Sequence, residues 1–244
     1  HMRTRLLFAI LFSTLNLFAS TTNISAQTRF TDFETGQPVQ GLNHVWEAVQ
    51  PFYGEIFPKV IRIKFHNDTF SGFEFPDIMW LGNFSRNPND RTKRFYEVVR
   101  HELSHLGNMH LTNSMSMENR FRFFDEGFAM FFEFPQKQEW LFQKSFKIAR
   151  KYLARGKVSF AQVQDWKSYF GDPLGGSRNE LDKNAYNIGA TFVFFLINNY
   201  GKENFRNFLV AIGDTKDLEL SLIRTYGISK EMAEKSWLNY ILKQ

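Results

Sequence analysis

The sequence predicts an α+β fold in which a small sheet comes first and a mainly helical region follows. Two stretches with strand character, residues 60–66 and 77–82, lie in the first third of the chain. Beyond Gly107 most of the chain has the composition and apolar spacing of helices. Strands that precede helices along a chain are typical of the α+β class, so the order of these elements predicts the class.

The N-terminal segment up to Ala26 has the features of a secretory signal peptide. His1-Met2 resembles a cloning remnant, so His1 is no candidate for a metal ligand. Two arginines then precede an apolar stretch, residues 6–19, and small residues stand near Ala26. A membrane anchor or a first core helix is the alternative, but polar residues interrupt the stretch, and a membrane span needs about 20 largely apolar residues. We expect export to a periplasm or out of the cell, and no membrane span after cleavage.

The composition of the remaining chain, residues 27–244, excludes several kinds of site. There is no cysteine, so neither a disulfide framework nor a thiolate metal site nor a cysteine nucleophile is available. This region has 28 Lys and Arg against 25 Asp and Glu, and the two signs are interleaved. Nucleic-acid-binding proteins usually concentrate basic residues on one face, so we expect no nucleic-acid partner. The length suits one core, and we expect one domain with an α/β lobe over residues 27–110 and a helical lobe over residues 111–244.

The region before residue 91 is predicted to contain one short helix and two strands. The helix covers residues 44–53. Residues 60–66 alternate between apolar and polar side chains, which is the period-two pattern of a half-buried strand. The second strand is predicted over residues 77–82 and is followed by a polar loop.

Helices are predicted from residue 91 onwards. The first covers residues 91–106, where Asn89 or Asp90 can cap its start. The apolar stretch 190–197 is too short to cross a membrane and is predicted to be a buried part of a helix. The other predicted helices cover residues 123–134, 139–154, 184–200, 205–212 and 230–242.

The helix over residues 91–106 carries a complete H-E-x-x-H motif, His101-Glu102-Leu103-Ser104-His105. Side chains four residues apart lie on one helix face, with Cβ atoms about 5–6 Å apart, so His101 and His105 can bind one zinc ion. Glu102 is displaced from that face and suits a general base that takes a proton from a metal-bound water. One turn of an ordinary polar helix is the alternative reading of the motif.

A catalytic zinc needs a third protein ligand as well as an open position. His110 is one candidate, because the pattern H-E-x-x-H-x-x-G-x-x-H supplies its third ligand from a nearby histidine. In that pattern the last histidine follows the second by six residues, whereas His110 follows His105 by five. We therefore do not expect His110 to be a ligand.

Residues 123–129 read F-F-D-E-G-F-A, and with the H-E-x-x-H motif they resemble the gluzincin peptidases, specifically the peptidase MA-like group related to zinc aminopeptidases. In that family an aromatic-x-x-E-G-x-A segment on a second helix supplies the third zinc ligand about 18 to 20 residues after H-E-x-x-H. Twenty residues separate His105 from Glu126. The resemblance implies a zincin-like fold and a Zn²⁺ ion held by His101, His105 and Glu126.

The resemblance extends over roughly residues 60–244. Residues 186–196 match the form Y-x-x-G-x-x-F-x-x-x-L of a later helix in the family. Related enzymes use a tyrosine on this helix to donate a hydrogen bond to the oxyanion, which makes Tyr186 the second expected catalytic residue; a tyrosine packed between helices is the alternative. The resemblance also implies that residues 78–81 form the edge strand that pairs with an extended substrate.

These observations predict an exported zinc metallopeptidase that acts on a peptide or protein. Zinc-activated water would attack the peptide carbonyl, with Glu102 as general base. Two alternatives remain: a secreted zincin-fold binding or assembly factor with little or no turnover, and a zinc hydrolase of a non-peptide amide. The sequence leaves open the substrate, the choice between endo- and exopeptidase activity, and the oligomeric state.

Overall fold

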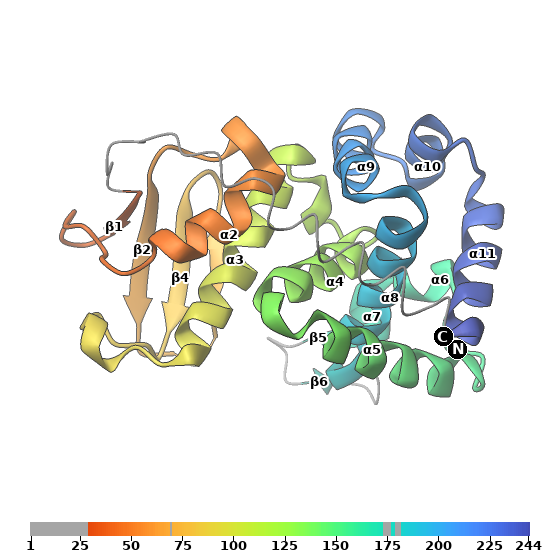
Figure 1. The fold of residues 1–244 in the computed structure, drawn as a ribbon, viewed down its shortest axis with the longest axis horizontal. Coiled ribbons are helices and arrows are strands. Elements are labelled where there is room, and N and C mark those ends of the chain that lie inside the picture. Colours follow the sequence, from red (N-terminus) through yellow and green to blue (C-terminus); the bar gives the residue numbers. More distant parts are fainter. Residues whose placement is uncertain (1–28, 69, 173–176, 179–181) are drawn as a thin grey trace.

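A four-stranded sheet and a larger set of helices make up the fold, which confirms the predicted α+β class (Figure 1). The computed structural model describes residues 29–68, 70–172, 177–178 and 182–244. The predicted signal segment lies outside these residues.

The sheet has the strand order β1-β2-β4-β3, in which β1 (Phe30–Asp32), β2 (Ile61–His66) and β4 (Ile78–Gly82) are parallel and β3 (Gly72–Glu74) is antiparallel to β4. Along β2 every second residue is buried, as the period-two pattern predicts. The strands β1 and β3 were not predicted, because three residues are too few to show a period of two.

The prediction that residues 78–81 form the edge of the sheet is wrong. These residues lie in β4, which pairs with β2 on one side and with β3 on the other. Among the described strands β3 pairs with β4 alone, so β3 is the edge beside the H-E-x-x-H helix. The ring of Phe73, in β3, stacks on the ring of His105, with the two ring centroids 5.2 Å apart.

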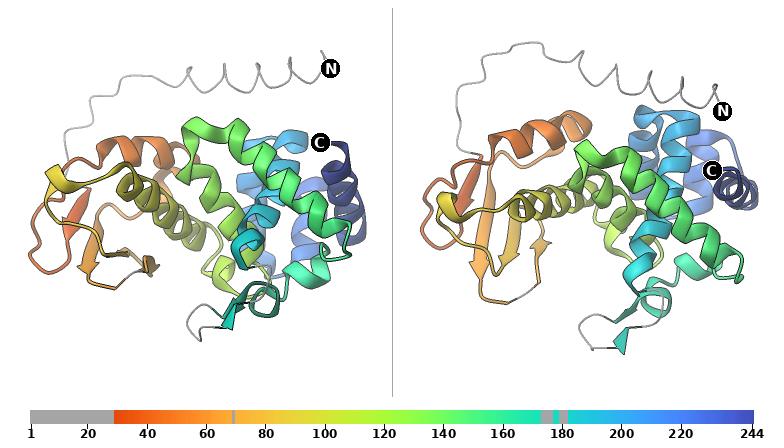
Figure 2. Two further views of the ribbon diagram at one scale, coloured as in Figure 1. Left: turned by 90° about the horizontal axis from the view of Figure 1, so that it is seen from below. Right: turned by 60° about the horizontal axis from the view of Figure 1, so that its bottom comes forward.

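Two helices, α2 (Asn43–Tyr53) and α3 (Lys93–Leu111), cover one face of the sheet (Figure 2). The helix α3 ends at Leu111, five residues beyond its predicted end at residue 106. Gly107 was expected to end the helix, but it lies inside it and allows close packing against α2. A Cβ atom at Gly107 would lie 2.6 Å from ring carbons of Tyr53. The missing side chain therefore lets Tyr53 of α2 approach the backbone of α3 closely.

The helices α4 (Arg122–Glu133) and α8 (Asp182–Tyr200) cross closely at two glycines. A Cβ atom at Gly127 would lie 2.4 Å from the carbonyl carbon of Gly189, and one at Gly189 would lie 2.0 Å from the carbonyl oxygen of Phe123. Both contacts are with backbone atoms, so any side chain at either position would force the helices apart. The crossing brings the start of α8 close to the part of α4 that contains Glu126.

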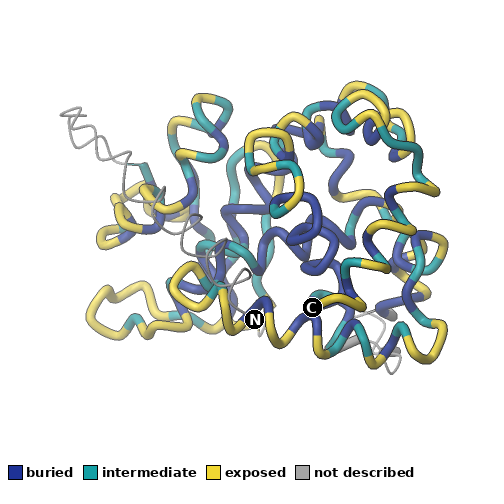
Figure 3. Tube along the Cα trace, turned by 45° about the vertical axis from the view of Figure 1, so that its right-hand side comes forward, coloured by how far each residue is buried: buried dark blue, intermediate teal, exposed yellow. Residues whose placement is uncertain are grey.

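The remaining helices surround this crossing, and the buried residues gather in the middle of the molecule (Figure 3). Residues 190–197 are buried within α8, as predicted. None of the described helices is long and apolar enough to span a membrane.

The helix α10 was not predicted, and α9 begins three residues before its predicted start. The remaining elements are α5 (Gln138–Leu153), α6 (Phe160–Val163), α7 (Trp166–Phe170), α9 (Lys202–Thr215), α10 (Leu218–Tyr226), α11 (Lys230–Lys243), the short strands β5 (Gly171–Asp172) and β6 (Ser177–Arg178), and the 3₁₀ turns η2 (Gly54–Ile56), η3 (Pro88–Asp90), η4 (Met115–Met117) and η5 (Pro135–Lys137).

Candidate metal centre

Two histidines of α3 and one glutamate of α4 converge on one point. The Nε2 atoms of His101 and His105 are 3.1 Å apart, and each lies 3.3 Å from Oε2 of Glu126. The helical spacing of four residues places both imidazoles on the face of α3 that packs against α4. The three residues predicted as zinc ligands are therefore brought together in space.

The distances between these three atoms fit a tetrahedral metal site. Ligand atoms at about 2.0–2.1 Å from a tetrahedral zinc ion lie about 3.3–3.4 Å from one another. Oε2 of Glu126 is buried and accepts no hydrogen bond among the described residues; its neighbours are the two Nε2 atoms at 3.3 Å, and a cation between the three atoms would compensate its charge. Two imidazoles and one carboxylate are also the donor set of many catalytic zinc sites, in which a fourth position stays open.

Each histidine contacts a second carboxylate through its other ring nitrogen. Nδ1 of His101 lies 2.9 Å from Oε2 of Glu133, and Nδ1 of His105 lies 2.7 Å from Oδ2 of Asp125. Such contacts fix the ring orientation and leave Nε2 available to bind a metal. Sequence reasoning missed both acids, although Glu133 follows Glu126 by seven residues and so shares its helix face.

The contact at His105 continues into the core. Oδ1 of Asp125 accepts a hydrogen bond of 2.7 Å from Nδ2 of Asn108, and Oδ1 of Asn108 lies 2.8 Å from the hydroxyl of Tyr53. This chain explains the glycine at 107, because a side chain there would displace the Tyr53 ring.

Arg122 holds the two adjacent carboxylates of α4 in place. Its guanidinium lies 2.6 Å from Oε1 of Glu126 and 3.1 Å from Oδ2 of Asp125. Because Oε1 is engaged in this way, Oε2 is the oxygen of Glu126 that faces the imidazoles. Arg122 belongs to no sequence motif that predicts the site.

The charges around the centre favour an anionic Glu126. Burial alone would raise the pKa of Glu126, but Arg122 and the two histidines hold it well below its usual range. Burial would likewise lower the pKa of His101, yet the carboxylates of Glu126 and Glu133 raise it to about 10. A proton on His101 thus occupies the place of a cation, and metal binding requires its release.

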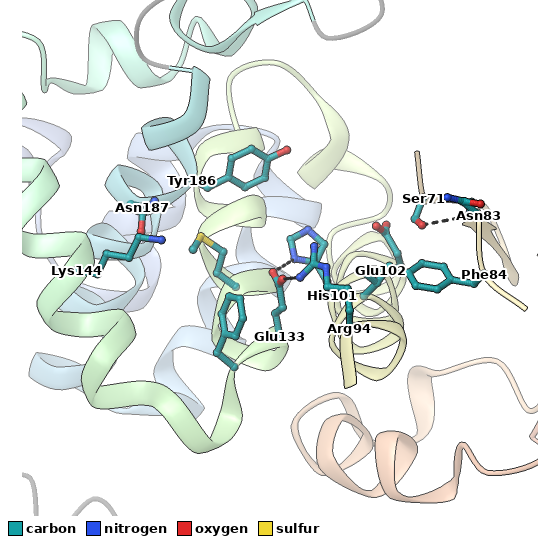
Figure 4. Close-up of a pocket in the computed structure, with 14 residues that line it drawn as sticks. Ser71, Asn83, Phe84, Arg94, His101, Glu102, Glu133, Lys144, Tyr186 and Asn187 are labelled. Atoms are coloured by element: carbon teal, nitrogen blue, oxygen red, sulfur yellow. Dashed lines mark hydrogen bonds and ion pairs between the residues drawn. The ribbon is translucent and has the colours of Figure 1, made fainter. Parts of the chain in front are cut away.

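A cavity of about 650 Å³ lies beside the centre and is lined by His101, Glu102 and Tyr186, among others (Figure 4). Burial raises the pKa of Glu102 above that of an ordinary glutamate. The Tyr186 ring centroid is 6.4 Å from that of His101, and the ring packs edge-on against Trp166 and Phe170. The two residues predicted to be catalytic therefore share this cavity.

His110 does not belong to the group of three. Its Nε2 donates a hydrogen bond of 2.8 Å to the carbonyl oxygen of Pro76, and its ring lies 5.0 Å from that of Phe75. The helix α3 carries it more than one turn beyond His105, next to the segment that follows β3.

No family model, curated protein or solved structure matches the chain in the comparisons with known proteins. The candidate centre is therefore defined by its own geometry: three donor atoms at tetrahedral spacing, two supporting carboxylates and one arginine.

The contact between Arg122 and Glu126 leads to a prediction. Arg122→Met is expected to weaken zinc binding about 10–100-fold, the effect typical of residues that orient a ligand. Without the guanidinium, Oε1 of Glu126 loses its partner, and the pKa of this carboxyl rises towards its usual range. A competition titration against a chromophoric chelator measures the change. Arg120→Met is the matched control, since Arg120 is exposed and pairs with Glu118; equal affinities in both variants would contradict the role of Arg122.

Proposed function

We propose that the protein is an exported zinc metallopeptidase of the gluzincin type with a zincin-like fold. One observation carries the proposal: three donor atoms at the spacing of a tetrahedral zinc site stand next to a buried glutamate that lines the adjoining cavity. His101, His105 and Glu126 would hold the metal. Zinc in such a site supplies a nucleophilic water at neutral pH and polarises a carbonyl group.

Glu102 handles the protons of the reaction. Hydrolysis forms a bond between water oxygen and the carbonyl carbon, breaks an O–H bond and then breaks the C–N bond. The carboxylate of Glu102 accepts the proton from water and delivers it to the nitrogen of the leaving amine. The raised pKa of Glu102 supports this role, because a base must also be able to release the proton as an acid.

Tyr186 stabilises negative charge on the carbonyl oxygen. Its ring and Glu102 lie on different sides of His101 (Figure 4). A phenol hydroxyl that donates a hydrogen bond to this oxygen acts mainly in the transition state, where the charge develops.

The edge strand β3 is the segment on which an extended peptide would lie. The outer edge of a sheet offers unpaired backbone N–H and C=O groups, with which a peptide can form a further strand. The stacking of Phe73 on His105 supports this arrangement, because it puts β3 against the face of α3 that carries the donor atoms. This role replaces the one expected for residues 78–81.

The role of Tyr186 is tested by Tyr186→Phe, which removes the hydroxyl and keeps the ring. We expect kcat to fall about 10²–10³-fold with zinc content unchanged. The control is Tyr200→Phe, since Tyr200 lies on the same helix and packs against Phe195 and Tyr226 instead of lining the cavity. A fall of less than about fivefold in Tyr186→Phe would remove this residue from the catalytic set.

The function itself is tested by digesting a proteomic peptide library with the purified protein. We expect one zinc ion per chain and cleavage that stops when a chelator removes the zinc and returns when zinc is restored. Chelator that has already been saturated with zinc is the control. A zinc-loaded protein that leaves every peptide intact would favour the binding or assembly factor, and cleavage that continues in the chelator would place the chemistry elsewhere.

A further inference from the structure

The cavity beside the metal centre has two ends of different character. At one end Ser71 and Asn83 come from the sheet region, and at the other end stand Lys144 of α5 and Asn187 of α8 (Figure 4). The apolar side chains of Met130 and Phe134 also line it. The end at Lys144 and Asn187 has no role in the proposed hydrolysis.

Lys144 brings a positive charge without a carboxylate partner to this cavity. Lys144 is exposed on α5, its ammonium lies 4.8 Å from the ring centroid of Trp140, and no ion pair joins it to an acid among the described residues. The other cation that lines the cavity is Arg94, which pairs with Glu133 and lies 3.7 Å from Glu97. The charge of Arg94 is thus balanced within the protein, whereas that of Lys144 is not.

Asn187 brings a hydrogen-bond donor to the same end. Its side chain is buried, with 3% exposure, and its Oδ1 accepts a hydrogen bond of 3.3 Å from Oγ of Ser145. Its Nδ2 donates no hydrogen bond among the described residues. The residue lines the cavity, so this amide N–H can donate to a ligand oxygen there.

The acids of the cavity do not cancel this preference. Glu133 is already paired with Arg94 and His101, and Glu102 neighbours the metal centre, where a bound cation adds positive charge. An unpaired ammonium and an amide N–H together match the oxygen atoms of a carboxylate.

We propose that Lys144 and Asn187 bind a carboxylate of the substrate, so that the protein prefers peptides with a carboxylate at a fixed distance from the cleaved bond. The inference rests on the proposed peptidase function and names its substrate class. The carboxylate belongs either to an Asp or Glu side chain or to the C-terminus of the peptide. In both cases Lys144 and Asn187 act as residues that determine specificity.

The test compares peptides that differ only in this group. Zinc-loaded protein is assayed with the best substrate from the library digest and with its amide counterpart, in which Gln replaces Glu, Asn replaces Asp or a carboxamide replaces the C-terminal carboxylate. We expect kcat/KM to be at least about tenfold higher for the carboxylate, as a charge-assisted contact implies. If a side-chain replacement lowers kcat/KM, the carboxylate belongs to Asp or Glu; if the C-terminal carboxamide lowers it, the carboxylate is the C-terminus.

Variants of α5 assign the preference to Lys144. Lys144→Met should lower kcat/KM at least about tenfold for the carboxylate peptide and leave the amide peptide within about twofold. Lys147→Met is the matched control, because Lys147 is exposed on the same helix and does not line the cavity. No preference for a carboxylate, or a preference that persists in Lys144→Met, would overturn the inference and leave the peptidase function standing.

If no peptide is cleaved, a binding measurement tests the carboxylate site at Lys144 and Asn187. Zinc-loaded protein is then titrated with unbranched dicarboxylates of three to eight carbons and with their monoamides, in which one carboxylate can reach the zinc and the other group probes the far end. Tighter binding of one dicarboxylate by at least about tenfold, lost in Lys144→Met, would support the carboxylate site although the peptidase function had failed. Equal binding of all pairs would overturn the site as well.

Discussion

Glu102→Gln is expected to keep its zinc and to lose about 10²–10⁴-fold in kcat, which is the usual contribution of a general acid–base group. Glutamine has the size and polarity of glutamate but accepts no proton from water at neutral pH. Glu102 is buried, lines the cavity and is not one of the three donor residues. The substitution therefore separates the chemical step from metal binding.

The measurement is kcat and zinc stoichiometry on the same preparation. Glu97→Gln is the matched control, because Glu97 is a buried carboxylate of the same helix that does not line the cavity. It should retain near-normal turnover. Full activity in zinc-loaded Glu102→Gln would show that another group serves as the base.

Glu126→Ala is expected to abolish stoichiometric zinc binding and with it all chelator-sensitive activity. Two imidazoles remain in this variant, but the only anionic donor of the group is gone, and Arg122 is left without its partner at 2.6 Å. Arg122 keeps its contact with Asp125, but the partly buried guanidinium loses one of its two carboxylates and its positive charge then opposes cation binding, so the loss exceeds that of one ligand alone. Metal analysis after gel filtration measures the zinc content.

His110→Ala is the comparison for this variant. His110 is bonded to the carbonyl oxygen of Pro76 and lies outside the group of three, so its removal should leave zinc binding intact. Zinc that persists in Glu126→Ala and disappears in His110→Ala would mean that the ligand set is wrong.

Most helices of this fold were predictable because each has an internal signal. Apolar residues recur at the helical period in α3, α4 and α5, and an apolar stretch marks α8, so these helices and α11 were predicted near their observed positions. Short elements give no such signal. The three-residue strands β1 and β3 form only because neighbouring strands supply their hydrogen bonds. Since β3 was not predicted, the sequence could not show that β3, and not residues 78–81, forms the edge of the sheet.

The pair His101 and His105 could be identified without a structure, because a spacing of four residues on a helix fixes their common face. The resemblance to gluzincins added Glu126 and Tyr186. The supporting side chains Arg122, Asp125 and Glu133 became evident only from the packing of the helices, as did Lys144 and Asn187 at the far end of the cavity. Contacts between helices depend on how closely and at which faces they cross. Here that depends on the backbone contact between Gly127 and Gly189, and no periodicity within one helix encodes the partner that it meets.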